Sequence, residues 1–373
     1  LTMLIQNAKA FIDGKFQEKT DLLIRDGRIS AIGTGLAAEG EELLDLGGDL
    51  LLPGFVDVHI HAFKGMDTMQ GEEAVRHMSR ELKKVGVAAF LPTTMSASPE
   101  DTVRALAGVK AVMERPEPDG AIVLGAHMEA PFLADAKAGA QLKQYFVDPD
   151  EENWQRYTGG LESVVRLITM APERAGAMEF ISALTKKGIT VSIGHTTADA
   201  ETTHAAAEAG ATHVTHTFNA QTPLNHRAPG VPGAALVDDR LQCEVISDGI
   251  HLHPDIVKLI IRTKGKEKLV AITDAMEAAG MPDGQYQLGG QEVFVHEGAA
   301  RLKDGTLAGS TLTMIRAFQN LIRFGATPEE AALMTTKTPA LSIGNEELGE
   351  IELGAPAIFS RFDENYAFKG TVG

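Results

Sequence analysis

Residues 51–63 read LLPGFVDVHIHAF, a Pro-Gly turn followed by an apolar run that ends in two histidines. The run is short and rich in Val, Ile and Phe, which is typical of a buried β-strand. Side chains two positions apart on a strand point to the same face, so His59 and His61 would lie close together. Neutral imidazole is a common zinc ligand, and this strand end is therefore a candidate metal site.

Seven more apolar runs follow along the middle of the chain. Together with the first run, they predict strands at residues 55–61, 88–94, 122–129, 164–171, 189–195, 213–218, 243–247 and 269–273. Amphipathic helix patterns lie between most of them, for example GEEAVRHMSRELKKVG at 71–86 and ADAETTHAAAEAGA at 198–211. Alternating strands and helices form parallel βα units, and eight such strands close a barrel. The sequence therefore predicts an α/β fold, a (β/α)8 TIM-like barrel.

Both ends of the chain differ from this middle part. Asp13-Gly14 and Asp26-Gly27 each stand between alternating apolar stretches, which predicts two tight hairpins. The segment from about residue 349 also has the pattern of short strands. We therefore expect a small β-sandwich domain from residues 1–52 and 345–373. The barrel would span 53–344 and carry a β-hairpin insertion near 285–305.

The composition of the chain indicates which classes of molecule the protein is expected to bind. The chain has 51 acidic against 34 basic residues, a net charge of −17, and no basic stripe of the kind that binds nucleic acid. No apolar run approaches the ~20 residues of a membrane span. Residues 1–6, LTMLIQ, lack the basic start of a signal peptide. The single cysteine, Cys243, cannot form an internal disulfide. We therefore expect a cytoplasmic protein without nucleic-acid or membrane partners.

Residues that can bind a metal stand at the carboxyl ends of five predicted strands. They are His59 and His61, Glu129, His195, His216 and Asp274. In a barrel the carboxyl ends of the strands meet at one rim, where the active site of such enzymes lies. The sequence thus predicts a divalent metal centre instead of several separate buried histidines. His127 shares a strand with Glu129 and is expected to pack behind the site, while His213 has no evident role.

Six further motifs follow the first one along the chain. They are GAHMEAPFL (125–133), VSIGHTTAD (191–199), THTFNAQTPLNHRAPG (215–230), SDGIHLHP (247–254), AITDAM (271–276) and DGTLAGSTLTM (304–314). In order and spacing, the chain resembles the N-acetylglucosamine-6-phosphate deacetylases of the amidohydrolase superfamily over nearly its whole length. The resemblance implies hydrolysis of the acetamide of N-acetylglucosamine 6-phosphate to glucosamine 6-phosphate and acetate, in amino-sugar catabolism.

The resemblance also implies roles for single residues. Glu129, His195 and His216 match the principal metal ligands, and His59 and His61 match positions that hold a second ion. Asp274 matches the acid/base that accepts a proton from metal-activated water and passes it to the departing amine. We expect one or two divalent ions per subunit, zinc first, although iron, cobalt and manganese also accept these ligands.

The substrate contacts are likewise implied by the resemblance. They are Ala140, Gln141, Asn219, Ala220, His226, Arg227, Asp248, His251, Leu307, Ala308 and Gly309. Arg227 would clamp the phosphate with its guanidinium fork, reaching across the interface of a homodimer. The segment 307–309 would close over the sugar of an amino-sugar phosphate substrate.

Two positions depart from the family pattern. Ala130 stands where a glycine is usual, and because alanine adopts positive φ less readily, we expect the loop after the third strand to be shifted. Gln141 stands where many members have a histidine that contacts the substrate. Glutamine can donate a hydrogen bond but cannot be cationic, so polarisation of the acetyl carbonyl would fall more on the metal.

Three other functions remain open. A deacetylase for the galactosamine epimer is one alternative, since the sequence does not decide between the two epimers. A cyclic-amide hydrolase would carry a modified lysine at the end of the fourth strand, where VVRLITMAPE offers none. A non-catalytic sugar-phosphate-binding barrel is conceivable because of Ala130 and Gln141, but the complete set of metal-ligand residues argues against it.

Overall fold

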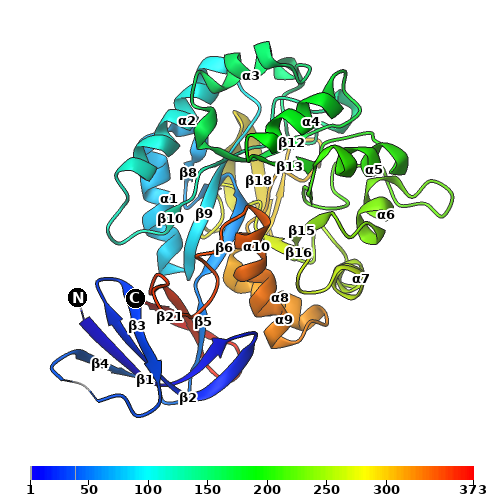
Figure 1. The fold of residues 1–373 in the computed structure, drawn as a ribbon. Coiled ribbons are helices and arrows are strands. Elements are labelled where there is room, and N and C mark those ends of the chain that lie inside the picture. Colours follow the sequence, from blue (N-terminus) through cyan, green and yellow to red (C-terminus); the bar gives the residue numbers. More distant parts are fainter. Residues whose placement is uncertain (1, 38) are drawn as a thin grey trace.

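A computed structural model of the chain describes residues 2–37 and 39–373. Leu1 and Ala38, which fall within the predicted small domain, lie outside the described residues. The molecule has a barrel surrounded by helices and a separate sheet in which both ends of the chain lie side by side (Figure 1). None of the helices in the described part is long and apolar enough to span a membrane.

Parallel strands form the predicted barrel. They are β6 (Phe55–Ile60), β9 (Val87–Thr94), β10 (Ile122–Val123), β11 (Ala126–Met128), β12 (Val165–Met170), β13 (Thr190–Ile193), β14 (His213–Val214), β15 (Gln242–Ile246) and β16 (Leu269–Ile272). Pairing runs in chain order from β6 through β9 and β11 to β16. A parallel bridge between Ile60 and Ala275 joins the last strand to the first. Across the same seam, the Thr273 hydroxyl donates to Asp57 over 2.6 Å.

The third predicted strand, 122–129, is two short strands in the structure. Gly125 lies between β10 and β11 with φ +146°, a backbone conformation that favours glycine. β10 pairs with β9, whereas β11 pairs with both β9 and β12. The break therefore lets the chain re-enter the barrel just before Glu129.

Helices cover the outside of the barrel, as the alternating pattern predicted (Figure 1). They are α1 (Glu72–Lys84), α2 (Pro99–Glu114), α3 (Glu151–Thr158), α4 (Ala177–Lys186), α5 (Ala200–Ala209), α6 (Gly230–Val237), α7 (Pro254–Lys264), α8 (Met314–Phe324), α9 (Pro328–Thr335) and α10 (Lys337–Ser342). The predicted helical segments 71–86 and 198–211 are α1 and α5. Side chains that cap the first turn start several of them, for example Asp199, whose carboxylate accepts from Thr202 N.

The two termini form one hydrogen-bonded sheet of seven strands, which confirms the predicted pairing of both ends. Its strands are β1 (Thr2–Ile12), β2 (Lys15–Arg25), β3 (Arg28–Gly33), β4 (Glu42–Asp45), β5 (Leu50–Pro53), β20 (Phe359–Phe362) and β21 (Phe368–Val372). Both predicted hairpins are present, with positive φ at Asp13, Gly14, Asp26 and Gly27. Since β5 continues directly into β6, this sheet anchors the strand that carries His59 and His61.

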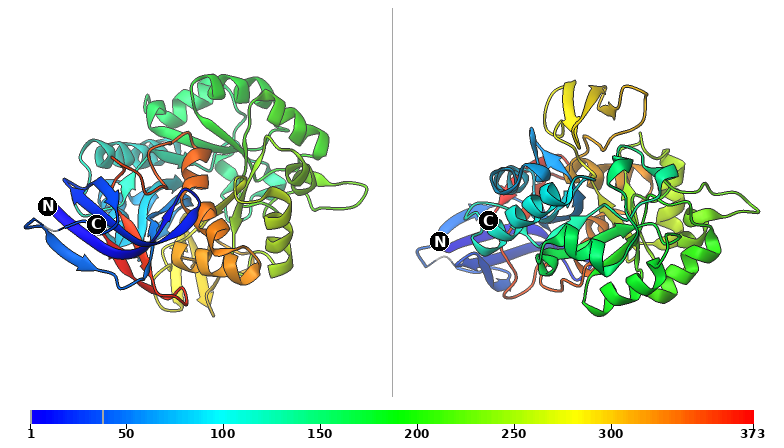
Figure 2. Two further views of the ribbon diagram at one scale, coloured as in Figure 1. Left: turned by 60° about the horizontal axis from the view of Figure 1, so that its bottom comes forward. Right: turned by 90° about the horizontal axis from the view of Figure 1, so that it is seen from above.

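The segment after β16 projects from the barrel as a small antiparallel sheet (Figure 2). It contains β17 (Gly284–Leu288), β18 (Gln291–His296) and β19 (Ala299–Arg301), so a third strand extends the predicted hairpin. A second short pair, β7 (Ala62–Phe63) and β8 (Met66–Asp67), follows the first barrel strand. Leu288, Val293 and Ala300 pack with Met95 and Met276 in a core of their own, which places the projecting sheet beside the barrel mouth.

Candidate metal centre

The six predicted metal-ligand residues converge inside the barrel mouth. They form two compact groups, His59 with His61 and Asp274, and Glu129 with His195 and His216. All six side chains are at least nine-tenths buried. They come from five different strand ends that are far apart in sequence, so only closure of the barrel brings them together.

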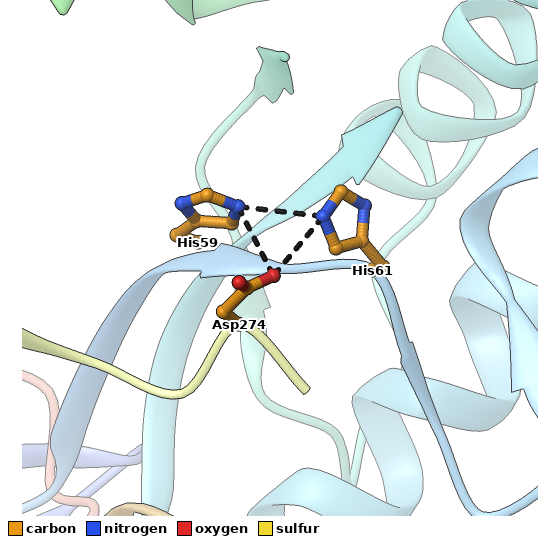
Figure 3. Close-up of side chains that lie close together, drawn as sticks. All are labelled: His59, His61 and Asp274. Atoms are coloured by element: carbon orange, nitrogen blue, oxygen red, sulfur yellow. Dashed lines mark hydrogen bonds and ion pairs between the residues drawn. The ribbon is translucent and has the colours of Figure 1, made fainter. Parts of the chain in front are cut away.

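The first group is shown in Figure 3, where the Asp274 carboxylate faces both imidazole rings. The Nε2 atoms of His59 and His61 are 3.4 Å apart. Oδ1 of Asp274 lies 3.4 Å from Nε2 of His59 and 3.2 Å from Nε2 of His61. These distances between potential ligand atoms are short enough for one ion to contact all three side chains.

Glu129 lies between the two groups and contacts both. Its Oε1 lies 3.1 Å from Nε2 of His195 and 3.0 Å from Nε2 of His216. Its Oε2 lies 3.0 Å from Nε2 of His61. Oε1 also lies 3.5 Å from Nε2 of His59, so the carboxylate contacts both groups.

Hydrogen bonds to backbone carbonyls orient three of the four imidazoles toward the centre. The Nδ1 atoms of His61, His195 and His216 face the carbonyl oxygens of Thr93, Lys137 and Asn219 at 3.2, 2.8 and 3.1 Å. A carbonyl only accepts, so Nδ1 of each ring carries a proton, and Nε2 is the nitrogen that can bind a metal. This tautomer is the one that a metal-binding histidine uses. The residues present thus fit a divalent metal ion with nitrogen and oxygen ligands.

The buried carboxylates and imidazoles of the site shift one another's pKa. Burial acts to lower the pKa of His59 and His61, yet the Asp274 and Glu129 carboxylates outweigh it and raise both, that of His61 to about 9. Burial acts to raise the pKa of Glu129, yet the imidazoles of His59 and His61 outweigh it and hold that pKa well below its usual range. Burial likewise acts to raise the pKa of Asp274, and the same two imidazoles keep it below its ordinary value. Two ionised carboxylates in a buried pocket require positive charge close by.

The backbone conformation directs three of these side chains into the barrel mouth. His195, His216 and Asp274 have φ of +47°, +27° and +50°. Residues other than glycine rarely adopt this left-handed conformation, and it is enriched at functional sites. Each follows the last residues of a barrel strand, so the chain turns sharply there and directs the side chain into the mouth.

A cavity of about 310 Å³ opens above the two groups. Seven of the predicted substrate-contact residues line it, namely Ala140, Gln141, Asn219, Ala220, His251, Leu307 and Gly309. Asp248 does not, but its Oδ2 lies 2.7 Å from Nδ1 of His251 and orients that ring. Ala308 is fully buried behind the wall. His226 and Arg227 lie outside the cavity, in an exposed loop, and the structure does not bring them to the site of their own subunit.

The two departures from the family pattern have clear local structures. Ala130 does not have positive φ, so alanine fits the backbone conformation at this position. Gln141 is held at both ends. Its Oε1 accepts from Ser96 N over 2.7 Å, and its Nε2 donates to Oε2 of Glu129 over 2.6 Å. Gln141 therefore orients the central carboxylate while it lines the cavity.

Several residues at the site were not predicted. Met95, Lys137, Gly139, Leu288 and Thr306 also line the cavity. Most belong to loops or to the projecting sheet, and no sequence pattern distinguishes them from ordinary surface residues. Glu244, by contrast, interrupts the apolar strand QCEVI, and a charge in a buried strand was a visible signal.

The chain matches the Amidohydrolase family over residues 50–370. It is 37% identical to an N-acetylglucosamine-6-phosphate deacetylase of Lysinibacillus sphaericus, over 100% of this chain and 96% of that protein. It is 35% identical to an N-acetylgalactosamine-6-phosphate deacetylase of Escherichia coli O157:H7, over 96% and 94%.

A solved structure of the same kind of enzyme is also similar to this chain. A mutant of N-acetyl-D-glucosamine-6-phosphate deacetylase from Mycobacterium smegmatis, in complex with N-acetyl-D-glucosamine-6-phosphate, superposes with a TM-score of 0.92 at 32% identity. The alignment covers 100% of this chain and 97% of that one. These matches confirm the resemblance found in the motifs, and the chain belongs to the amidohydrolase family.

Proposed function

We propose that this chain hydrolyses the acetamide of N-acetylglucosamine 6-phosphate to glucosamine 6-phosphate and acetate. The observation that carries the proposal is the pair of metal-ligand groups that meet at Glu129 below the cavity. The names and full-length coverage of the relatives support the choice of substrate. The reaction would serve amino-sugar catabolism.

The residues supply each step of amide hydrolysis. A divalent cation held at Glu129 would lower the pKa of a bound water to about 7 and polarise the acetyl carbonyl. Asp274 is placed to accept a proton from the attacking water as the oxygen of that water bonds to the carbonyl carbon. The same carboxyl then donates the proton to the nitrogen as the carbon–nitrogen bond breaks. His251 and the amide of Asn219 line the cavity wall as hydrogen-bonding groups for the sugar.

We further propose that two ions, with zinc as the metal, would be held per subunit by the two ligand groups, both of which Glu129 contacts. The contacts of Glu129 with both histidine groups support two ions. Four imidazoles and two carboxylates form a ligand set that zinc accepts well, although iron, cobalt and manganese share it.

The phosphate would be held by Arg227 of a second subunit in a homodimer. Arg227 is exposed in a loop that projects away from the barrel between β14 and α6 (Figure 1). Leu224 in this loop and Val237 at the end of α6 are 47% and 74% exposed, which supports an interface on this side. We place the protein in the cytoplasm with its charged, phosphorylated substrate.

Acetate release from the purified protein tests the proposal. We expect turnover of N-acetylglucosamine 6-phosphate that is lost on chelation and returns with zinc. The matched control is the Glu129→Gln variant, in which added zinc should not restore activity. A protein that binds the sugar phosphate but releases no acetate with any of the four metals would be a binding barrel, and the enzymatic proposal would be wrong.

The galactosamine epimer is the second candidate substrate. The Escherichia coli relative named for that epimer is nearly as similar to this chain as the glucosamine enzyme. Comparing kcat/KM for the two epimeric phosphates under identical metal loading decides between them. A ratio above ten in either direction would name the preferred sugar.

A further inference from the structure

Glu244 is a fully buried carboxylate that belongs to neither ligand group. It lies on β15, the barrel strand between those that carry His216 and Asp274. Its Oε2 is 3.1 Å from Nδ1 of His59, and its Oε1 is 3.3 Å from Nδ1 of His213. Glu244 therefore joins a candidate metal ligand to a histidine with no other assigned role.

His213 is also fully buried and is held from the opposite side. Its Nε2 lies 3.1 Å from the carbonyl oxygen of Ser342, the last residue of α10. A carbonyl only accepts, so Nε2 of His213 carries a proton and donates it. The His213 ring is thereby fixed with Nδ1 toward Glu244, and one proton must lie between that nitrogen and Oε1.

The same reasoning fixes the tautomer of His59. Oε2 of Glu244 also accepts the backbone N–H of His216 over 3.3 Å, so this oxygen acts as an acceptor. Nδ1 of His59 consequently donates to it, and the lone pair on Nε2 points at His61 and Asp274. The hydrogen bond to Glu244 thus fixes the orientation of the His59 ring and leaves Nε2 as the nitrogen that can bind a metal.

His59 differs in this respect from the other three imidazoles. Those rings donate to backbone carbonyls, whereas His59 donates to a carboxylate. A carboxylate is the stronger acceptor, and a histidine that donates to it is the more basic ligand. Burying a carboxylate inside an apolar barrel costs free energy unless the carboxylate is paired. Packing alone therefore does not explain why a glutamate stands at position 244.

We propose that Glu244, held by His213, is a positioning residue that makes His59 a ligand and thereby determines whether the His59–His61–Asp274 site holds an ion. This rests on the metal site of the proposed function but is tested by ion content instead of turnover. The ion at Glu129, His195 and His216 should depend much less on Glu244, because Lys137 and Asn219 orient those two rings and Glu244 meets only the backbone N–H of His216.

The test uses the Glu244→Gln holoenzyme, which keeps the side-chain size and removes the charge. After dialysis against buffered free zinc, elemental analysis should give two ions per wild-type chain and one per variant chain. In chelator competition, the dissociation constant of the weaker site should rise roughly 10- to 100-fold. Cys243→Ala is the matched control, because it alters the adjacent buried residue of the same strand, whose side chain points to the other face.

A double variant identifies the ion that is lost. His61→Ala disables the same site directly, so adding Glu244→Gln to it should cause no further loss of zinc. If Glu244→Gln does not fold, His213→Gln replaces it, with a weakening of the same site expected. Two ions bound to Glu244→Gln with wild-type affinity, or only one bound to the wild type, would overturn the proposal. A wild type that binds two ions but releases no acetate would overturn the proposed function instead.

Discussion

At the scale of single residues, Asp274 is placed both to bind an ion and to carry a proton. Its contacts with His59 and His61 are both made by Oδ1, so we expect the second carboxylate oxygen to take the proton. Asp274→Asn should therefore lower kcat/KM by about 10²- to 10⁴-fold, the usual contribution of general acid–base catalysis.

Metal analysis of this variant separates chemistry from ligation. Asp274→Asn should retain at least the ion of Glu129, His195 and His216, which Asp274 does not help to form. Acetate release and zinc content are measured on the same preparation. Turnover within tenfold of the wild type would show that another group moves the proton.

Gln141 carries a second prediction at this scale. Gln141→Leu keeps much of the side-chain volume but leaves Oε2 of Glu129 and the Ser96 N–H without their partner. Outer-sphere partners of metal ligands typically affect metal affinity by about 10- to 100-fold, and we expect a loss of this size in chelator competition. Gln291→Leu is the control, since Gln291 donates to the Ala140 carbonyl and not to Glu129. Equal effects of the two variants would count against a role for Gln141 in holding Glu129.

At the scale of elements, Gly194 sets how closely β13 and β14 approach. A Cβ at this position would lie 2.6 Å from Cβ of Thr215 and 2.8 Å from Cγ2 of Thr169. Gly194→Ala should therefore force the strand ends apart and cost about 1–3 kcal/mol of folding free energy. It should also displace His195, the next residue.

Thermal unfolding of the zinc-loaded protein measures this cost. Gly284→Ala is the control, because an added Cβ there meets only Tyr286 at an ordinary 3.6 Å. We expect a clear fall in Tm and in zinc affinity for Gly194→Ala and little change for Gly284→Ala. Unchanged Tm in both variants would mean that the barrel relaxes around position 194.

The elements themselves were largely predictable because their signals are local. Each barrel strand is a short apolar run, and each ligand residue stands where such a run ends, so chain order alone placed six residues at one rim. The break in the third strand depended on one glycine, Gly125, within an otherwise regular run. The third strand of the projecting sheet, Ala299–Arg301, is too short to leave a pattern of alternation.

What could not be predicted depends on contacts between distant segments. The partners of Glu244 are 185 and 31 residues away, so its charge was visible but its function was not. Gln141 was expected to contact the substrate, and its hydrogen bond to Glu129 arises only from the fold of the loop. Arg227 was expected to hold the phosphate across a dimer interface and His226 to contact the substrate, and both lie outside the cavity of their own subunit.

At the scale of the whole molecule, the proposed dimer would let this loop complete the site of a second subunit. Both views of Figure 2 show it projecting from the barrel between β14 and α6. If Arg227 binds phosphate, Arg227→Ala should raise KM for the phosphorylated sugar roughly 10- to 100-fold, the value of a lost charge-assisted pair. The unphosphorylated sugar serves as the control, and an equal effect on both would refute the clamp.

Mixing two defective variants tests whether Arg227 acts across the interface. Arg227→Ala keeps its own Asp274, and Asp274→Asn keeps its own Arg227, so a mixed dimer holds one site with both groups intact. After unfolding and joint refolding at equal amounts, random pairing should restore about a quarter of the wild-type activity at low substrate. Activity that stays at the level of the separate variants would mean that Arg227 serves its own subunit or none. Dilution below the dissociation constant of the dimer should abolish the recovered activity, because the loop then has no partner site to complete.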